Sequence, residues 1–281
     1  MKKKNQILDH LILMAGVLFL LLPVWIAFVS STHRPEVILG QGLQFWFGDY
    51  FWETYSAVLF DGTGFTGKVN ALLMLGNSMI LGLGFSIGKI LISTIAAYAI
   101  VYFRFPAGGM IFWIIFSSLL LPLEVRIIPS YEVVAQMGLL NSYTGLILPL
   151  IASATATFFF RQFYKSVPEE LLESARIDGA GPYRFFVDIL MPLSTTMIAA
   201  IFIIMFVVGW NQYLWPILMT TDESYYTIVM GIKNILNDLE GNNVPEYNKA
   251  LALAVLALLP PVLVVVVLQR WFVKGLVETE K

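Results

Sequence analysis

Long apolar runs alternate along this chain with short polar segments, and the pattern predicts a series of membrane-spanning helices. A helix needs about 20 apolar residues to cross the hydrocarbon core of a bilayer. Runs near that length with few charged residues occupy residues 11–31, 71–103, 107–127, 137–162, 189–218 and 250–270. We therefore expect an all-α fold, a polytopic membrane protein in which residues 1–281 form a single transmembrane domain of six helices.

The composition strengthens this assignment and excludes several classes of function. Hydrophobic residues make up 58% of the chain and charged residues only 13%, far from the composition of a soluble protein. The chain has no cysteine and only two histidines, so thiolate and histidine-rich metal sites are not expected. It has no basic stripe for nucleic acid, and its spans lack the residue pairs typical of an intramembrane enzyme. We expect no catalytic residue, and no metal or cofactor bound by this chain.

The distribution of Lys and Arg indicates the orientation in the membrane. The N-terminal MKKKNQ and the apolar run after it imitate a secretory signal, but bulky residues continue through Val29 and favour a retained first span. With a cytoplasmic N-terminus, eleven of the 17 basic residues fall in cytoplasmic segments and five in outer loops. Basic residues prefer the cytoplasmic side, so we expect both termini there.

The first outer loop contains the aromatic stretch FWFGDYFWETY. Amphipathic rings gather at the headgroup level of a membrane. We expect Trp46, Tyr50, Trp52 and Tyr55 to act as such anchors, and an aromatic platform for a ligand is the alternative.

A charged segment, residues 168–192, interrupts the apolar pattern between the fourth and fifth spans. A helix is expected to begin near Pro168 and to end near Asp178, because Gly179 can take the left-handed conformation that closes a helix. A second short helix is expected from Gly181-Pro182 onward. The first helix carries a small apolar stripe that is expected to face the membrane surface or a partner protein, and consists of Leu171, Leu172 and Ala175.

The spacing inside this segment resembles a known pattern. Glu173-Ser174-Ala175 is followed after three residues by Gly179, and after nine more by Ile189-Leu190-Met191-Pro192. The cytoplasmic loop of ABC importer membrane subunits has the form E-A-A, three residues, G, nine residues, I-x-L-P, and Ser174 and Met191 are mild departures from it. In that family the loop is a coupling helix that inserts into a groove of the ATPase subunit. The resemblance implies a coupling role for Glu173, Ser174, Ala175, Asp178 and Gly179.

Two further stretches are similar to the carbohydrate-uptake permeases of this family, WNQYLWP at residues 210–216 and QRWFVKGL at residues 269–276. Together with LPLEVRI at residues 121–127, SATAT at residues 153–157 and RFF at residues 184–186, the ending of the chain most resembles the permeases of importers for sn-glycerol 3-phosphate. This resemblance implies the fold of a type I ABC importer permease with six transmembrane helices, in a bacterial inner membrane. It also implies transport of sn-glycerol 3-phosphate, and a neutral sugar or oligosaccharide is the alternative substrate.

The same resemblance implies a set of partners. They are a second, similar permease, two ATPase subunits that bind ATP and Mg, an extracytoplasmic solute-binding protein, and membrane lipid. ATP would be hydrolysed by the separate subunits. A passive channel is the competing class, and the charged segment would have no role in it.

Five residues are candidates for the substrate path. Lys89 lies within a span, and pairing in the helix bundle or reaching to the interface are its alternatives. Arg126 lies at the expected outer end of the third span, where a guanidinium can hold a phosphate, and a salt bridge or a docking contact is the alternative. Trp210, Asn211 and Tyr213 offer a stacking face and polar groups for a small polyol, and helix packing explains them equally well.

The stretch GLGFSIGKI at residues 82–90 imitates a phosphate-binding P-loop but lacks the required residues and setting. Gly84 and Gly88 within it form a GxxxG pair. Such pairs let spanning helices approach closely, so we expect a packing surface here.

Overall fold

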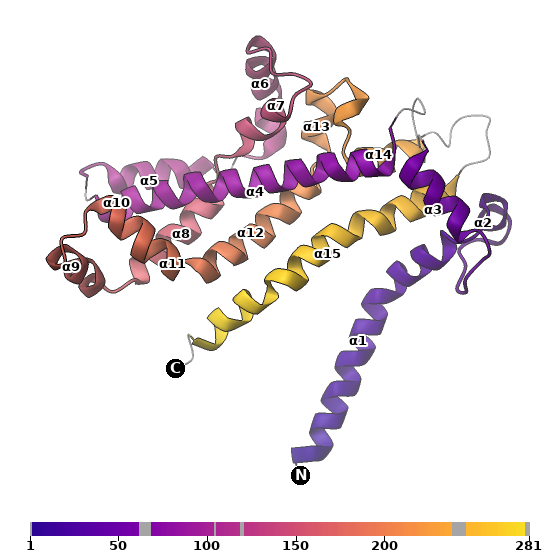
Figure 1. The fold of residues 1–281 in the computed structure, drawn as a ribbon, viewed down its shortest axis with the longest axis horizontal. Helices are drawn as coiled ribbons and strands as arrows, with labels where there is room; N and C mark the ends of the chain where they lie inside the picture. The colour runs from indigo at the N-terminus through magenta and orange to yellow at the C-terminus, as the bar shows by residue number, and fades with distance from the viewer. Residues whose placement is uncertain (1, 62–68, 104, 119–120, 238–245, 279–281) are drawn as a thin grey trace. The chain divides into compact units, whose positions relative to one another are not determined.

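The computed structural model of the protein describes residues 2–61, 69–103, 105–118, 121–237 and 246–278, and every regular element within these ranges is helical. The chain divides into two compact units, residues 1–77 with 226–260 and residues 78–225 with 261–281. Two long helices, α4 (Ala71–Tyr102) and α15 (Tyr247–Glu278), contribute to both units (Figure 1). The expected single transmembrane domain stays a prediction, and each unit is described by itself.

The first unit contains α1 (Lys2–Ser30), α2 (Pro35–Gln41), α3 (Phe51–Phe60) and α14 (Ile228–Asn237), with the beginnings of α4 and α15. Aromatic and hydroxyl contacts join the end of α1 to α3. The ring of Tyr55 stacks on Phe51 with centroids 4.5 Å apart, and its hydroxyl lies 3.0 Å from Ser31 Oγ. Asn77 in α4 donates a hydrogen bond of 2.9 Å to the Tyr226 carbonyl, which ties α4 to the segment before α14.

The aromatic stretch of the first outer loop divides into exposed and buried side chains. Trp46 and Trp52 are 81% and 79% exposed, as expected of interfacial anchors. Tyr50 is half-buried, and the Arg34 guanidinium lies over its ring, 5.2 Å from the centroid. Tyr55 is only 8% exposed and belongs to the core of this unit, so its expected position at the headgroups is wrong. Its hydroxyl partner is Ser31, which the sequence pattern does not reveal.

The second unit contains the middle of the chain, and its elements follow in order. They are α5 (Gly108–Ser117), α6 (Leu123–Gln136), α7 (Tyr143–Ile147), η2 (Leu148–Leu150), α8 (Ala154–Ser166), α9 (Glu169–Ile177), α10 (Pro182–Arg184), the π-helical η3 (Phe185–Leu190), α11 (Met191–Leu193), α12 (Thr195–Trp210), α13 (Leu214–Met219) and η4 (Glu223–Tyr225). In this unit α8 contacts α5 and α12, while α13 contacts α6 and α7 (Figure 1). The Trp215 indole in α13 donates to the Leu146 carbonyl in α7 over 3.1 Å, so α13 is held by a hydrogen bond as well as by packing.

The glycines of α4 lie where other helices approach it, as the GxxxG pair predicts. A Cβ atom at Gly84 would lie 2.5 Å from Ile147 Cδ1, and one at Gly88 would lie 2.5 Å from Ile151 Cγ2. Gly209 of α12 leaves similar room for Phe85, whose Cβ would lie 3.0 Å from an added methyl group. Because glycine has no side chain, the neighbouring segments can pack closely at these positions, which confirms the expected packing surface.

Five of the expected spans correspond to single helices or bent helix pairs. The helices long and apolar enough to cross a membrane are Ile7–Ser30, Ala71–Tyr102 and Tyr247–Trp271. Two bent pairs qualify as single spans, Tyr143–Leu150 with Ala154–Ser166, bent by 48°, and Pro182–Leu193 with Thr195–Trp210, bent by 73°. The exact count of six spans stays a prediction.

The third expected span, residues 107–127, is not one continuous helix. α5 ends at Ser117 and α6 begins at Leu123, with Pro122 in the capping position between them. A proline has no N–H to continue the hydrogen-bond ladder and disfavours helical geometry in the residue before it. The 10 residues of α5 give a length of about 15 Å, half of the hydrocarbon core. The chain therefore reaches α6 near mid-depth of the membrane if α5 enters from one surface.

Candidate functional site

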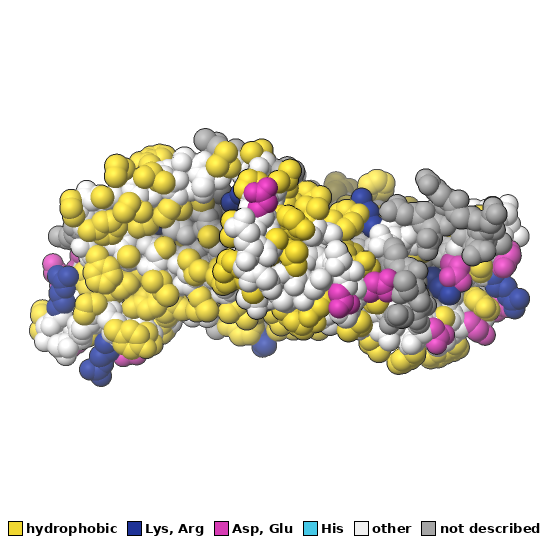
Figure 2. Space-filling model, turned by 90° about the horizontal axis from the view of Figure 1, so that it is seen from above, with side chains coloured by type: hydrophobic (Ala, Val, Ile, Leu, Met, Phe, Trp, Pro, Cys, Tyr) yellow, Lys and Arg dark blue, Asp and Glu magenta, His cyan; other side chains and the backbone are white. Residues whose placement is uncertain are grey.

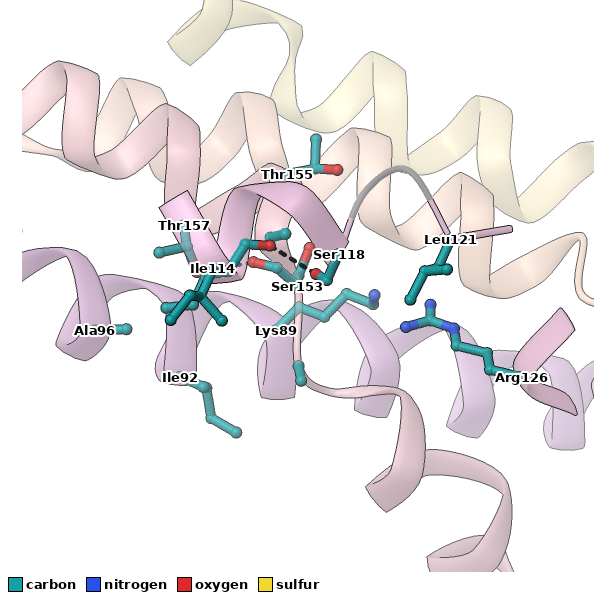
Figure 3. Close-up of a pocket in the computed structure, with 13 residues that line it drawn as sticks. Lys89, Ile92, Ala96, Ile114, Ser118, Leu121, Arg126, Ser153, Thr155 and Thr157 are labelled. Carbon is teal, nitrogen blue, oxygen red and sulfur yellow. Dashed lines mark hydrogen bonds between the residues drawn. The ribbon is translucent and has the colours of Figure 1, made fainter. Parts of the chain in front are cut away.

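A cavity of about 450 Å³ lies in the second unit where α4, α5, α6 and the beginning of α8 meet (Figure 3). Two cationic side chains reach into it, Lys89 from α4 and Arg126 from α6. The remaining lining residues are apolar or carry hydroxyl groups: Ile92, Ala96, Ile114, Ile115, Ser118, Leu121, Ala152, Ser153, Ala154, Thr155 and Thr157. The structure thus brings together two candidates of the substrate path that lie 37 positions apart in the sequence.

Arg126 occupies a different place from the one expected. The sequence pattern puts it at the outer end of a continuous third span. Because the helix breaks before Pro122, Arg126 instead lies in the first turn of α6, beside residues from the middle of α4. Figure 3 shows its guanidinium directed toward the Lys89 ammonium group across the cavity.

Among the side chains that the structure describes, which do not include that of Glu124, the two cations have no acidic partner. Lys89 Nζ lies over the Phe85 ring, 4.1 Å from its centroid, and the described lining contains no Asp or Glu. The ion pairs formed by described residues lie elsewhere, Arg184 with Asp188 and Lys249 with Glu246. Two like charges facing one another inside an apolar bundle are costly, and an anion between them would relieve that cost.

The beginning of α8 adds further donors to the cavity. Ser153 caps this helix by accepting a hydrogen bond of 3.2 Å from the Ala156 N–H, and Ala154 and Thr155 follow it into the first turn. The first N–H groups of a helix have no partner within the helix and carry the positive end of its dipole. Ser153, Ala154 and Thr155 all line the cavity, so this helix end and both cations favour an anion at the same place.

The hydroxyl groups of the cavity differ in what they can offer. Ser118 Oγ donates to the Ile115 carbonyl over 2.6 Å, and Thr157 Oγ1 donates to the Ser153 carbonyl over 2.8 Å. Thr155 has no such internal hydrogen bond among the described residues and lies on the cavity wall (Figure 3). Its hydroxyl can therefore donate to a bound molecule, and the sequence pattern did not single it out as a site residue.

The other three candidates of the substrate path lie apart from this cavity. Trp210 is 1% exposed and its ring stacks on Phe206 with centroids 5.8 Å apart. Asn211 caps the end of α12, and its amide donates to the Val207 carbonyl over 2.9 Å. Tyr213 is half-buried just before α13. Packing and capping account for Trp210 and Asn211, and none of the three lines the cavity.

The charged segment 168–192 folds as expected at its turn. α9 ends at Ile177, Gly179 has a φ of +75°, and the Ala180 N–H donates to the Ala175 carbonyl over 2.8 Å. This is the hydrogen bond of a Schellman motif, in which a left-handed residue closes the helix. A Cβ at Gly179 would meet nothing within 4 Å, so the glycine is there for its backbone conformation alone.

Two of the three residues in the apolar stripe of α9 face their own unit. Ala175 is 4% exposed and Leu172 is half-buried, and both pack on the core of their own unit. Leu172 lines a small cavity with Tyr102 of α4 and Phe185 of η3, and Tyr98 of α4 donates to the Pro182 carbonyl over 2.8 Å. The expectation that the stripe needs an external surface is therefore wrong for Leu172 and Ala175, because the end of α4 covers them, whereas Leu171 is 40% exposed.

Other side chains of the segment remain exposed. Ile177 is 86% exposed and Tyr183 is 80% exposed, and Glu173 and Ser174 lie on the exposed side of α9. In Figure 2 charged side chains gather at the end of the second unit near α9 and α10, beside a mainly hydrophobic surface toward α5. Sequence reasoning missed Ile177 and Tyr183, although apolar residues off the buried stripe of an amphipathic helix are a usable signal.

Residues 89–278 match the model of a family described as the binding-protein-dependent transport system inner membrane component. The chain belongs to this family. The match covers α4 from Lys89 onward, the cavity and the charged segment.

Relatives of this transport component are similar along nearly their whole length. The sn-glycerol-3-phosphate transport system permease protein UgpE of Brucella melitensis is 46% identical over 277 residues, covering 99% of this chain and 98% of the relative. The protein of the same name from Yersinia pestis is 48% identical over 276 residues, covering 98% and 97%. The resemblance to this group of permeases is therefore confirmed.

The fold of the transport component also has a counterpart among solved structures. A chain in the crystal structure of a bacterial ABC transporter involved in the import of the acidic polysaccharide alginate has a TM-score of 0.81 and 21% sequence identity. The similarity covers 96% of this chain and 97% of the other. The expected all-α fold of an ABC importer permease is confirmed, and the chain is a multi-pass inner membrane permease component of a transport system.

Proposed function

We propose that this permease subunit carries sn-glycerol 3-phosphate across the bacterial inner membrane in an ATP-driven importer. The observation that carries the proposal is the cavity in which Lys89 and Arg126 face one another, with no acidic partner among the side chains that the structure describes. The names of the relatives support the same substrate. A neutral sugar or oligosaccharide, the alternative, would leave both charges uncompensated in an apolar bundle.

The phosphate group suits the donors of this cavity. The Arg126 guanidinium offers a fork of two parallel N–H donors, and Lys89 offers a compact charge on the opposite side. A dianionic phosphate loses hydration as it enters an apolar path, and each hydrogen bond to a charged group offsets about 1.5–3 kcal/mol of that cost. The first turn of α8 and the Thr155 hydroxyl add neutral donors. We keep Trp210, Asn211 and Tyr213 in the path as candidates outside this cavity.

We assign the ATPase coupling to the charged segment. Glu173 and Ser174 on the exposed side of α9 would contact the ATPase, while the buried Ala175 holds α9 against the core of its unit. Asp178 and Gly179 close α9 and direct the chain into α10. A movement of the ATPase would thereby reach α4 through the contact between Tyr98 and Pro182.

The proposed assembly contains a second permease, two ATPase subunits and an extracytoplasmic solute-binding protein. ATP and Mg would bind to the ATPase subunits, and this chain would hold no cofactor and hydrolyse nothing. Both of its termini would lie in the cytoplasm, on the side of α9.

The test is ATP-driven uptake of radiolabelled sn-glycerol 3-phosphate by the complete complex in proteoliposomes, with unlabelled maltose as competitor. We expect uptake that maltose does not inhibit, and a loss of about tenfold or more in the Lys89→Gln and Arg126→Gln variants. Arg126→Lys should lose less, because it keeps the charge and loses only the fork. Lys165→Gln is the matched control, since Lys165 is exposed in the last turn of α8 and does not line the cavity. Uptake that both cavity variants retain, or that maltose abolishes, contradicts the proposal.

A further inference from the structure

A second cavity, of about 360 Å³, lies in the first unit where the beginnings of α2, α3 and α15 meet. Most of the side chains that line this cavity are polar or charged. Its lining residues are Arg34, Pro35, Glu36, Tyr50, Glu53, Thr54, Ala57, Glu246, Asn248 and Lys249. Nothing in the proposed transport path uses this cavity.

One buried group in its wall has no partner. Asn248 is 2% exposed, and its amide nitrogen donates to Thr54 Oγ1 over 2.9 Å. Its amide oxygen is buried and accepts no hydrogen bond from the described residues. A buried acceptor without a donor costs about 1–3 kcal/mol, so this position calls for a donor beyond the described residues of the unit.

The charged groups around Asn248 show which charge that donor should carry. Both basic residues of the wall have partners already, since Lys249 Nζ lies 2.7 Å from Glu246 Oε1 and the Arg34 guanidinium lies over Tyr50. The carboxylates of Glu36 and Glu53 have no ion pair among the described residues and are exposed. The unused groups are therefore two carboxylates and one amide oxygen, all of them acceptors.

A guanidinium or ammonium group matches this set. It supplies several N–H donors and a positive charge, and it would satisfy the buried amide oxygen and one or both carboxylates together. A metal ion is a poorer match, because the described residues contain no group of three or more carboxylate, histidine or cysteine side chains placed to hold one.

We propose that this cavity receives an Arg or Lys side chain of the solute-binding protein when that protein docks on the permease. The proposal rests on the proposed function, since the proposed topology places the end of α1 and the beginning of α15 on the extracytoplasmic side. The family itself is dependent on a binding protein, which must dock on that side. Charged pairs at such a contact speed association and fix its orientation.

The experiment measures the affinity of the complete complex in nanodiscs for the solute-binding protein that stimulates its ATPase activity, whatever solute that protein carries. In the Glu36→Gln, Glu53→Gln double variant we expect binding weaker by about tenfold or more and a smaller dependence on salt. The matched control is Asp49→Asn, Asp61→Asn, which removes two carboxylates of the same outer segment that do not line the cavity. Its affinity should stay within about twofold of the unmodified complex, the scatter expected of surface substitutions.

A photocrosslinking residue at Ala57, on the cavity wall, identifies the occupant. We expect a crosslink to a peptide of the solute-binding protein that contains Arg or Lys. Replacing that Arg or Lys by Glu should weaken binding to the permease, and Glu53→Arg in the permease should restore it. Equal affinities of the double variant and its control overturn the inference, as do crosslinks only to lipid or to the permease subunits. Because affinity is read without transport, this failure differs from a failure of sn-glycerol 3-phosphate uptake in the unmodified complex.

Discussion

Single residues determine whether the cavity of the second unit favours an anion, and a substitution of Ser153 tests this most directly. Its Oγ caps α8, and the same side chain lines the cavity that holds Lys89 and Arg126. Ser153→Asp should keep the cap, because Asp is as good a capping residue as Ser, and should place a negative charge in the cavity that holds the two cations. We expect the thermal stability of the complex to be unchanged or higher, and uptake of sn-glycerol 3-phosphate to fall at least tenfold.

Ser153→Asn is the matched control, since Asn caps a helix equally well without a charge. It should keep most of the uptake. Equal uptake in the Asp and Asn variants, measured in the same proteoliposomes, would show that the cavity does not lie on the path of the anion.

At the scale of an element, the charged segment 168–192 depends on one turn. Gly179 has a φ of +75°, whereas Gly181, two positions later, has a φ of −72°, and an added Cβ meets nothing within 4 Å at either position. Gly179→Ala should therefore cost about 1–2 kcal/mol of backbone strain, while Gly181→Ala should cost almost nothing. We expect solute-stimulated ATPase activity to fall severalfold only in the Gly179 variant, with normal insertion of both. A similar loss in the Gly181 variant would contradict a role for the left-handed turn.

The break between α5 and α6 acts at the same scale. Pro122 ends the helical ladder, and α6 then delivers Arg126 to the middle of α4. The bend between η2 and α8 likewise opens the first turn of α8 toward the cavity. Both interruptions leave backbone groups inside a membrane protein, which is tolerated where the backbone faces protein or a polar cavity.

For the whole molecule, the exposed side chains of the charged segment form the proposed contact with the ATPase. Ile177 and Tyr183 are 86% and 80% exposed, although Leu172 and Ala175 of the apolar stripe of α9 pack against their own unit. The double variant Ile177→Ser, Tyr183→Ser should weaken association of the ATPase by about tenfold or more, because two large side chains lose their buried area in the complex. Permease insertion and stability should not change, since neither side chain contributes to the core of its unit.

The measurement is the amount of ATPase that co-purifies with the two permease subunits as the concentration of the complex is lowered. Ala175→Ser, at a buried position of the same helix, should instead reduce the thermal stability of the permease itself. Full recovery of ATPase in the double variant would place the docking surface elsewhere.

The local features of this protein could be predicted from its sequence. Apolar runs locate the membrane helices because the bilayer sets their length, and Gly179 predicts the turn after α9 because only glycine takes that φ without strain. The spacing from Glu173 to Pro192 indicates the family, which the comparisons confirm. These conclusions rest on properties of neighbouring residues, and neighbours in sequence remain neighbours in the fold.

The tertiary structure alone decided which distant groups meet. Lys89 and Arg126 share a cavity because the helix breaks before α6, and apolar spacing shows neither the break nor the side to which α6 turns. Leu172 and Ala175 of α9 are covered because the end of α4 lies beside them, and Asn248 acquires its cavity from two other helices. The physical reason is that these contacts depend on how helices pack. Packing depends on the shapes of both surfaces, and the pattern along one segment describes only one of them.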